Sequence, residues 1–194
     1  MNEPHVDIAR AQEAQWLKHY YFSRGAFSLL WVALAFSIGL HSAGIAAALF
    51  VVYPAWDALA NFVDMSRSGG AAANRTQALN VVISLVTTIA VIVALGAQGT
   101  HWVLDVFGVW AIVSGLLQLG TALRRWKRFG AQWAMILSGA QSALAGVLFI
   151  VQDHAATPPA IAKVAGYAAV GAIYFLISAL WLWVGQRRAA AAQA

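Results

Sequence analysis

The stretch of sequence that decides the fold is residues 78–96, ALNVVISLVTTIAVIVALG, which contain no charged side chain. As a helix this stretch would be about 28 Å long at 1.5 Å per residue, close to the roughly 30 Å hydrocarbon core of a bilayer. Its polar and apolar residues do not alternate as they would in a strand of a membrane β-barrel. Because lipid satisfies no backbone hydrogen-bonding group, the stretch is expected to cross the membrane as a helix.

The same apolar character extends over the whole chain of 194 residues. Hydrophobic residues make up 61% and charged residues 10%, whereas a typical soluble domain has roughly 25% charged residues. So little polar surface excludes a soluble enzyme and a disordered protein, and the absence of cysteine excludes a disulfide scaffold. The mean hydropathy is +0.70. We therefore predict an all-α integral membrane protein.

Six stretches are expected to be transmembrane helices. By residue number they are 20–40, 43–63, 78–96, 102–123, 133–151 and 161–184. Short connections join the first stretch to the second, the third to the fourth and the fifth to the sixth. The sequence therefore predicts three helical hairpins, each with its tight turn on the same side of the membrane.

The basic residues predict how the hairpins are oriented. An even number of spans places both termini on one side, and that side carries every Lys and Arg except Lys163. The positive-inside rule then puts both termini in the cytoplasm. Residues 1–19 become a cytoplasmic segment, with an interfacial helix as an alternative, and residues 185–194 become a cytoplasmic tail. The net charge of +5 reflects this orientation, and no nucleic-acid partner is expected.

The hairpins also share a sequence pattern. The second, fourth and sixth spans carry an aromatic residue, a polar residue four positions later and an arginine ten positions beyond that. The three sets are Tyr53–Asp57–Arg67, Trp110–Ser114–Arg124 and Tyr174–Ser178–Arg188. An internal repeat is one interpretation, and chance agreement between broad residue classes is the other.

With this pattern, residues 108–127 (GVWAIVSGLLQLGTALRRWK) and 133–150 (WAMILSGAQSALAGVLFI) resemble the HdeD-like acid-resistance membrane proteins. The resemblance implies a small bacterial inner-membrane protein built from short repeats. It also implies a non-enzymatic role in acid or stress resistance. Its motifs are glycine and leucine patterns, so it transfers no site residue to this chain.

The second span holds an aspartate, Asp57, deep in the membrane. Tyr53, Asn61 and Asp64 lie on the same helical face as Asp57, and an ionised carboxylate at the depth of Asp57 costs at least about 2.5–3.5 kcal/mol. Arg24 reaches a similar depth on the first span and is the expected partner. The candidate intramembrane polar site comprises Arg24, Tyr53, Asp57, Asn61, Asn80 and Gln118. These residues would either line a cavity open to the cytoplasm or form a closed polar network.

A second pair of acidic and basic residues lies nearer the cytoplasmic interface. Asp64 and Arg67 are three residues apart, so we expect a surface ion pair of little energetic value. Small residues mark faces where helices approach closely. On the fifth span these are Ser138, Ser142 and Gly146, and on the fourth they are Ala111 and Gly115. Such faces serve either packing within the bundle or dimerisation.

Each of the three outer turns contains one histidine, namely His41, His101 or His154. Histidine titrates near pH ~6.5, so these residues are candidates for pH sensing. The alternative is that histidine is simply tolerated at the membrane interface.

No phosphate-binding loop, metal-ligand motif or nucleophile with a nearby base is apparent in the sequence, and we predict neither an enzyme nor a cofactor. Three functions remain open. The first is the non-enzymatic resistance role, and the second is a transporter or channel for protons or a small solute that uses the Arg24–Asp57 layer. The third is a scaffold subunit that binds another membrane protein. The lipid bilayer is the expected partner, with a homo-oligomer or a second membrane protein as further candidates.

Overall fold

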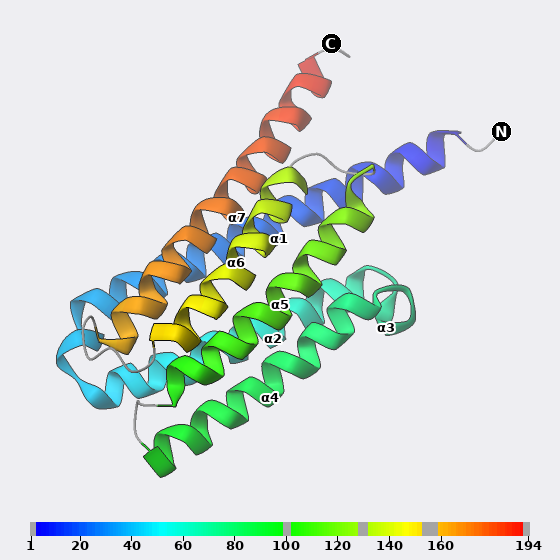
Figure 1. Cartoon of the computed structure of the whole chain (residues 1–194). Coiled ribbons are helices and arrows are strands. Elements are labelled where there is room, and N and C mark those ends of the chain that lie inside the picture. The colour runs from blue at the N-terminus through cyan, green and yellow to red at the C-terminus, as the bar shows by residue number, and fades with distance from the viewer. Residues whose placement is uncertain (1–2, 99–101, 128–131, 153–158, 192–194) are drawn as a thin grey trace.

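The computed structural model describes residues 3–98, 102–127, 132–152 and 159–191 (Figure 1). All regular structure in these ranges is helical. The helices are α1 (Glu3–Ser37), α2 (Ala43–Arg67), α3 (Gly70–Ala73), α4 (Arg75–Gln98), α5 (Val103–Arg125), α6 (Gln132–Gln152) and α7 (Ala160–Ala191), with a short 3-10 helix, η1 (Gly39–His41).

Six of these helices are long and apolar enough to cross a membrane. The spans are Ala11–His41, Ala43–Arg67, Arg75–Ala97, Val103–Arg125, Gln132–Val151 and Ala160–Arg188. Their outward faces carry large apolar side chains, among them Ile89 at 63% and Leu144 at 61% exposure. Such surfaces on long apolar helices are typical of helices that face lipid. The prediction of an all-helical multi-pass membrane protein in contact with the bilayer is confirmed.

The two ends of the bundle differ in charge. Both termini lie at the same end (Figure 1). The basic residues there include Lys18, Arg67, Arg75, Arg124, Arg125, Lys127, Arg187 and Arg188, and we call this the basic end. The opposite end, which carries η1, is called the far end. Residues 3–19 are helical and continue directly into the first span, so α1 is one helix of 35 residues rather than a span preceded by a separate interfacial helix.

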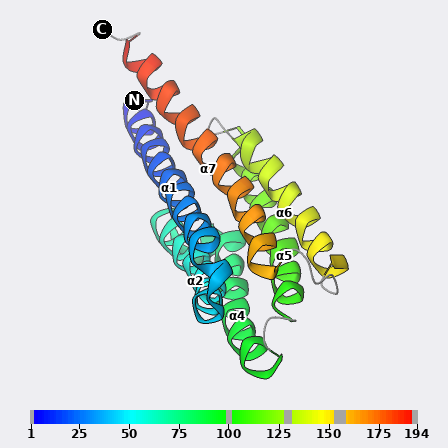
Figure 2. The same cartoon turned by 90° about the vertical axis from the view of Figure 1, so that its left-hand side faces the viewer.

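The closest helix pairs are α5 with α6, α1 with α7 and α2 with α4. Figures 1 and 2 both show α5 beside α6 and α1 beside α7. Two of these pairs are consecutive helices joined at the basic end, and the third brings the first and last helices together. Helices joined by the predicted outer turns, such as α1 and α2, are antiparallel neighbours that pack less closely. The tightest pairs therefore differ from the predicted hairpins.

Glycines explain why α5 and α6 pack so closely. A Cβ added at Gly115 would lie 2.7 Å from the carbonyl oxygen of Gly139, and one added at Gly108 would lie 2.8 Å from that of Gly146. The Ser142 hydroxyl donates across the same interface to the Ala111 carbonyl at 3.0 Å. The predicted small-residue faces therefore pack against each other within one chain, as the first of the two interpretations proposed.

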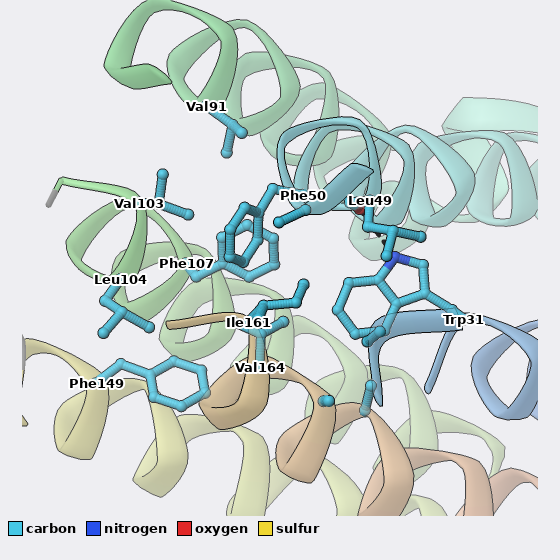
Figure 3. Close-up of a cluster of buried hydrophobic side chains, with 14 of the residues drawn as sticks. Trp31, Leu49, Phe50, Val91, Val103, Leu104, Phe107, Phe149, Ile161 and Val164 are labelled. Atoms are coloured by element: carbon cyan, nitrogen blue, oxygen red, sulfur yellow. Dashed lines mark hydrogen bonds between the residues drawn. The ribbon is translucent and has the colours of Figure 1, made fainter. Parts of the chain in front are cut away.

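Large aromatic side chains fill the half of the bundle nearer the far end (Figure 3). We call this group the aromatic cluster; its principal members are Trp31, Phe50, Phe107, Trp110 and Phe149. Phe50 and Phe107 meet edge to face with ring centroids 5.7 Å apart. The polar atom of Trp31 is satisfied, since its Nε1 donates to the Leu49 carbonyl at 2.8 Å. The buried polar residues described below lie between this cluster and the basic end.

Candidate functional site

The expected contact between Arg24 and Asp57 is present. Arg24 Nη2 donates to Asp57 Oδ1, and the Asp57 residue is only 4% exposed. The other carboxylate oxygen, Oδ2, accepts from Ser84 Oγ at 2.7 Å and from Asn61 Nδ2 at 3.0 Å. Asn80 Nδ2 approaches the same oxygen at 3.5 Å. One carboxylate thus joins α1, α2 and α4.

The remaining predicted residues surround this pair. Tyr53 packs between the aromatic rings of Trp31 and Trp110, with centroids 4.9 and 5.8 Å away. Gln118 on α5 donates from Nε2 to the Met135 carbonyl at 3.4 Å, which ties α5 to α6. Asn61, Asn80 and Gln118 all line cavities beside the ion pair. The structure therefore brings the six predicted residues into one region.

Two further residues of this region, Tyr20 and Ser84, were not identified from the sequence. Tyr20 accepts a hydrogen bond from Arg24 Nη1 at 2.9 Å. Ser84 accepts from Trp110 Nε1 at 3.0 Å while it donates to Asp57. The signal for Ser84 was present, because it lies four residues after Asn80 and therefore on the same face of α4.

A second buried carboxylate, Asp64, lies two helical turns nearer the basic end. Asp64 is fully buried, at 0% exposure, and Arg125 Nη2 donates to its Oδ2 at 2.9 Å. Gln77 Nε2 donates to the same oxygen at 2.7 Å, and Trp16 Nε1 donates to Oδ1 at 3.2 Å. Asp64 therefore connects α1, α2, α4 and α5.

The predicted surface pair between Asp64 and Arg67 is wrong. Arg67 is exposed, and its guanidinium carbon lies 4.4 Å from the centre of the Trp16 ring. Asp64 instead shares the inward face of α2 with Asp57, seven residues earlier. A fully buried carboxylate such as Asp64 needs charged or polar donors from neighbouring helices, because an unpaired buried charge is costly. Arg125 on α5 supplies the charge.

Two small polar cavities lie beside the Arg24–Asp57 pair. The cavity nearer the basic end has a volume of about 30 Å³ and is bordered by Tyr20, Gln77 and Arg125. The cavity at Asp57 has a volume of about 40 Å³ and extends to Ser142 and Tyr167. Arg24, Asn80, Gln118 and Phe175 line both. Since one water needs roughly 10–15 Å³ of such volume, each cavity has room for about two to four waters.

Two buried polar atoms beside the Asp57 cavity lack a hydrogen-bond partner among the described residues. They are the acceptor Asn80 Oδ1 and the donor Trp56 Nε1, and both residues line this cavity. An unsatisfied buried polar atom costs about 1–3 kcal/mol. A water molecule, which both donates and accepts, would satisfy both kinds of atom. The lining is therefore suited to water or to a comparably small hydrogen-bonding solute.

Aromatic rings close the Asp57 cavity toward the far end. Trp110 meets Tyr167 edge to face at 6.4 Å and Phe107 at 5.6 Å. Tyr167 in turn donates to the Ser142 hydroxyl at 2.8 Å, since the proton of Ser142 is directed to the Ala111 carbonyl. Phe107 and Trp110 also belong to the aromatic cluster, of which Figure 3 shows the apolar side chains around Phe107. The polar interior thus occupies one half of the bundle and ends at aromatic side chains.

The candidate pH-sensing histidines are only partly covered by the structure. His41 is exposed and ends η1 at the far end. His101 and His154 lie outside the described residues. In the part of the chain that the structure describes, no group of three or more His, Asp or Glu side chains could hold a metal ion.

Comparison with protein-family models, with curated proteins and with solved structures finds no match to this chain. The resemblance to the HdeD-like proteins, and the acid-resistance role that it implies, therefore stay predictions. The fold and the site together establish a multi-pass membrane protein with a buried polar region between its helices.

Proposed function

We propose that this protein provides a pathway for protons, and for polar solutes no larger than a few waters, through the Arg24–Asp57 layer of the inner membrane. Both termini and the basic end would face the cytoplasm. The proposal is for a transporter or channel, with no enzymatic step and no cofactor. The described conformation would be one in which the pathway is closed at the aromatic cluster.

The observation that carries the proposal is the polar cavity at Asp57. A closed structural network would leave neither space nor unsatisfied atoms beside its central ion pair. Here the cavity has a volume of about 40 Å³, and Asn80 Oδ1 and Trp56 Nε1 lack partners within the described residues. Ionisable residues that line a water-containing cavity inside a membrane are typical of proton and ion pathways.

The small volume of the site favours protons over larger solutes, and its lack of net charge disfavours other ions. Asp57 and Arg24 neutralise each other, as do Asp64 and Arg125, so the site offers no net charge for an ion. A proton delivered by water to Asp57 would neutralise the carboxylate and weaken its hold on Arg24. Proton uptake at Asp57 would thus alter the contacts that join α1, α2 and α4.

Proton flux in reconstituted liposomes tests the proposal. We expect a proton gradient to dissipate faster with the wild-type protein than in empty liposomes, as read from an enclosed pH-sensitive dye. Asp57→Asn should remove most of this flux, and Ser84→Ala should reduce it. Thr88→Val is the matched control on α4, because among the described residues its hydroxyl donates to a backbone carbonyl, that of Ser84 at 2.8 Å, and not to Asp57. Flux that is equal in wild-type and Asp57→Asn protein would refute the proposal.

The orientation rests on the distribution of basic residues and has its own test. Eleven of the 12 Lys and Arg residues lie on the side of the termini, which the positive-inside rule assigns to the cytoplasm. A reporter placed after Ala194 or between Ser68 and Gly69 should report a cytoplasmic location. A reporter between Asp153 and His154 should report the outer side, and the reverse result would overturn the orientation.

A role in acid or stress resistance would be one physiological use of such a pathway. This role is supported only by the resemblance of residues 108–127 and 133–150 to the HdeD-like proteins. The pathway itself lies within a single chain and requires neither a homo-oligomer nor a scaffold partner.

A further inference from the structure

An open groove lies at the basic end of α5 and α6, away from the buried polar site. It is lined by Leu123, Arg124, Trp126, Lys127 and Ile136 and has a volume of about 470 Å³. Leu123 and Trp126 are more than half exposed, at 57% and 52%. The groove therefore presents apolar side chains on the surface of the bundle, where the spanning helix α5 ends.

The charged rim of this groove is fixed in place. Arg124 Nη2 donates to Asn74 Oδ1 at 2.6 Å, and Nη1 donates to the Ala73 carbonyl at 3.5 Å. These bonds hold the guanidinium against the C-terminal end of α3. Lys127, one turn further along the chain, is exposed. Two basic side chains thus line an otherwise apolar groove.

The position of the groove along the membrane normal follows from its residues. Arg125 ends a helix that spans the membrane, so Leu123 lies at the inner boundary of the hydrocarbon core. Trp126 is the type of residue that occupies the headgroup level. The groove therefore runs from the hydrocarbon region, at Leu123 and Ile136, to the aqueous interface, at Arg124 and Lys127.

We propose that this groove is a binding site for an anionic phospholipid. One acyl chain lies against Leu123 and Ile136, and the phosphate meets Arg124 and Lys127. Charge complementarity selects this occupant, because a zwitterionic headgroup offers no net charge to the two cations and a free phosphate offers nothing to the apolar floor. Basic pockets beside transmembrane helices are known to recognise anionic headgroups in this way. The site is separate from the Arg24–Asp57 layer, so either proposal can fail without the other.

Lipid retention by the purified full-length chain tests this proposal. The protein is delipidated in a neutral detergent and titrated with phosphatidylglycerol or with phosphatidylcholine of the same acyl chains, and bound lipid is counted by native mass spectrometry. We expect one tightly bound phosphatidylglycerol and much weaker phosphatidylcholine binding. Each basic side chain near a membrane surface contributes about fivefold to anionic-lipid affinity. The double variant Arg124→Gln, Lys127→Gln should therefore bind phosphatidylglycerol about 25-fold more weakly than the wild type.

A matched control removes the same charge elsewhere at the basic end. The double variant Arg187→Gln, Arg188→Gln alters two exposed residues of α7 that do not line the groove. It should keep wild-type affinity, and an equal loss in both double variants would overturn the proposal in favour of diffuse attraction. Lys127→Gln alone, which leaves the Arg124–Asn74 bond intact, should still lose about fivefold. If the first double variant fails to fold, this single variant decides the outcome.

Two further binding measurements distinguish a phospholipid from other ligands. Glycerol phosphate carries the same phosphate without acyl chains, and it should not compete with phosphatidylglycerol at equal concentration. Effective competition would mean that the groove takes a soluble phosphate, and binding of phosphatidylcholine as tight as that of phosphatidylglycerol would mean an unselective apolar surface. Either result would overturn the proposal.

Discussion

Removing the Asp57 carboxylate should destabilise the fold strongly, and the structure allows the loss to be divided among its contacts. Asp57→Leu leaves the Arg24 guanidinium without its carboxylate, and breaking a buried ion pair from one side costs about 3–5 kcal/mol. The Arg24 side chain is 13% exposed and borders both cavities. Water can therefore partly solvate the unpaired cation, and we expect a loss of about 3–4 kcal/mol, in the lower part of that range.

Removing Arg24 instead should cost less. In Arg24→Leu the carboxylate keeps the hydrogen bonds from Ser84 at 2.7 Å and Asn61 at 3.0 Å. Each hydrogen bond to a charged group contributes about 1.5–3 kcal/mol, so these two offset part of the lost attraction. We expect a loss of about 2–3 kcal/mol for Arg24→Leu, again because one charge of a buried pair stays behind.

The double variant separates the ion pair from its surroundings. With both charges gone, the remaining penalty comes from Ser84 and Asn61, which have lost their acceptor, and it should be about 2 kcal/mol. Unfolding free energies measured by denaturant titration in detergent micelles, followed by circular dichroism, give the full cycle. Arg187→Leu, an exposed arginine on α7, controls for the loss of a surface charge. If the losses of the two single variants sum to the loss of the double variant within about 0.5 kcal/mol, the two residues do not interact.

The other predictions concern the second carboxylate, the α5–α6 interface and the histidines. Asp64→Leu should lower the free energy of unfolding by about 3–5 kcal/mol, because it leaves the buried Arg125 without its carboxylate. Arg67→Leu should change the free energy of unfolding by under about 1 kcal/mol. Equal losses in the same titration would contradict the observed pairing of Asp64 with Arg125. Gly115→Ala should cost about 1–3 kcal/mol by forcing α5 from α6. Gly166→Ala, whose Cβ would meet nothing within 4 Å, should be neutral or stabilising, and a loss at Gly115 no larger than at Gly166 would refute the close packing. A strain carrying the His41→Gln, His101→Gln, His154→Gln protein should survive acid shock less well than the wild type at equal expression, and equal survival would remove the histidines from pH sensing.

Composition was sufficient to predict the membrane class and the number of spans, because burying an apolar helix in lipid depends on the helix itself. The ends of the helices were harder to predict. The first span was expected to begin at residue 20, yet α1 begins at Glu3. Hydropathy marks where a helix leaves the lipid but not where its backbone hydrogen bonds stop. A polar segment that packs against its neighbours, as Trp16 does through Asp64, can therefore extend a spanning helix into water.

The partners of the two carboxylates show a similar limit. Helical periodicity placed Asp57 on an inward face, and the short turn between the first two spans placed Arg24 nearby. The same periodicity placed Asp64 on that face too, but its partner, Arg125, is 61 residues away in sequence. No local spacing identifies that partner, because it depends on how α5 packs against α2 and α4. Arg67, the nearer arginine in sequence, lies on the outer surface of α2.

The contacts of Asp57 also connect the polar half of the bundle to the aromatic half. Asp57 Oδ2 accepts from Ser84 Oγ at 2.7 Å, and the same hydroxyl oxygen accepts from Trp110 Nε1 at 3.0 Å. Trp110 in turn packs edge to face against Phe107 and Tyr53. Because Ser84 has a single proton, its donation to Asp57 fixes the hydroxyl as the acceptor for Trp110. A change of charge on Asp57 would therefore alter the hydrogen bond that Ser84 accepts from Trp110, whose ring closes the cavity toward the far end.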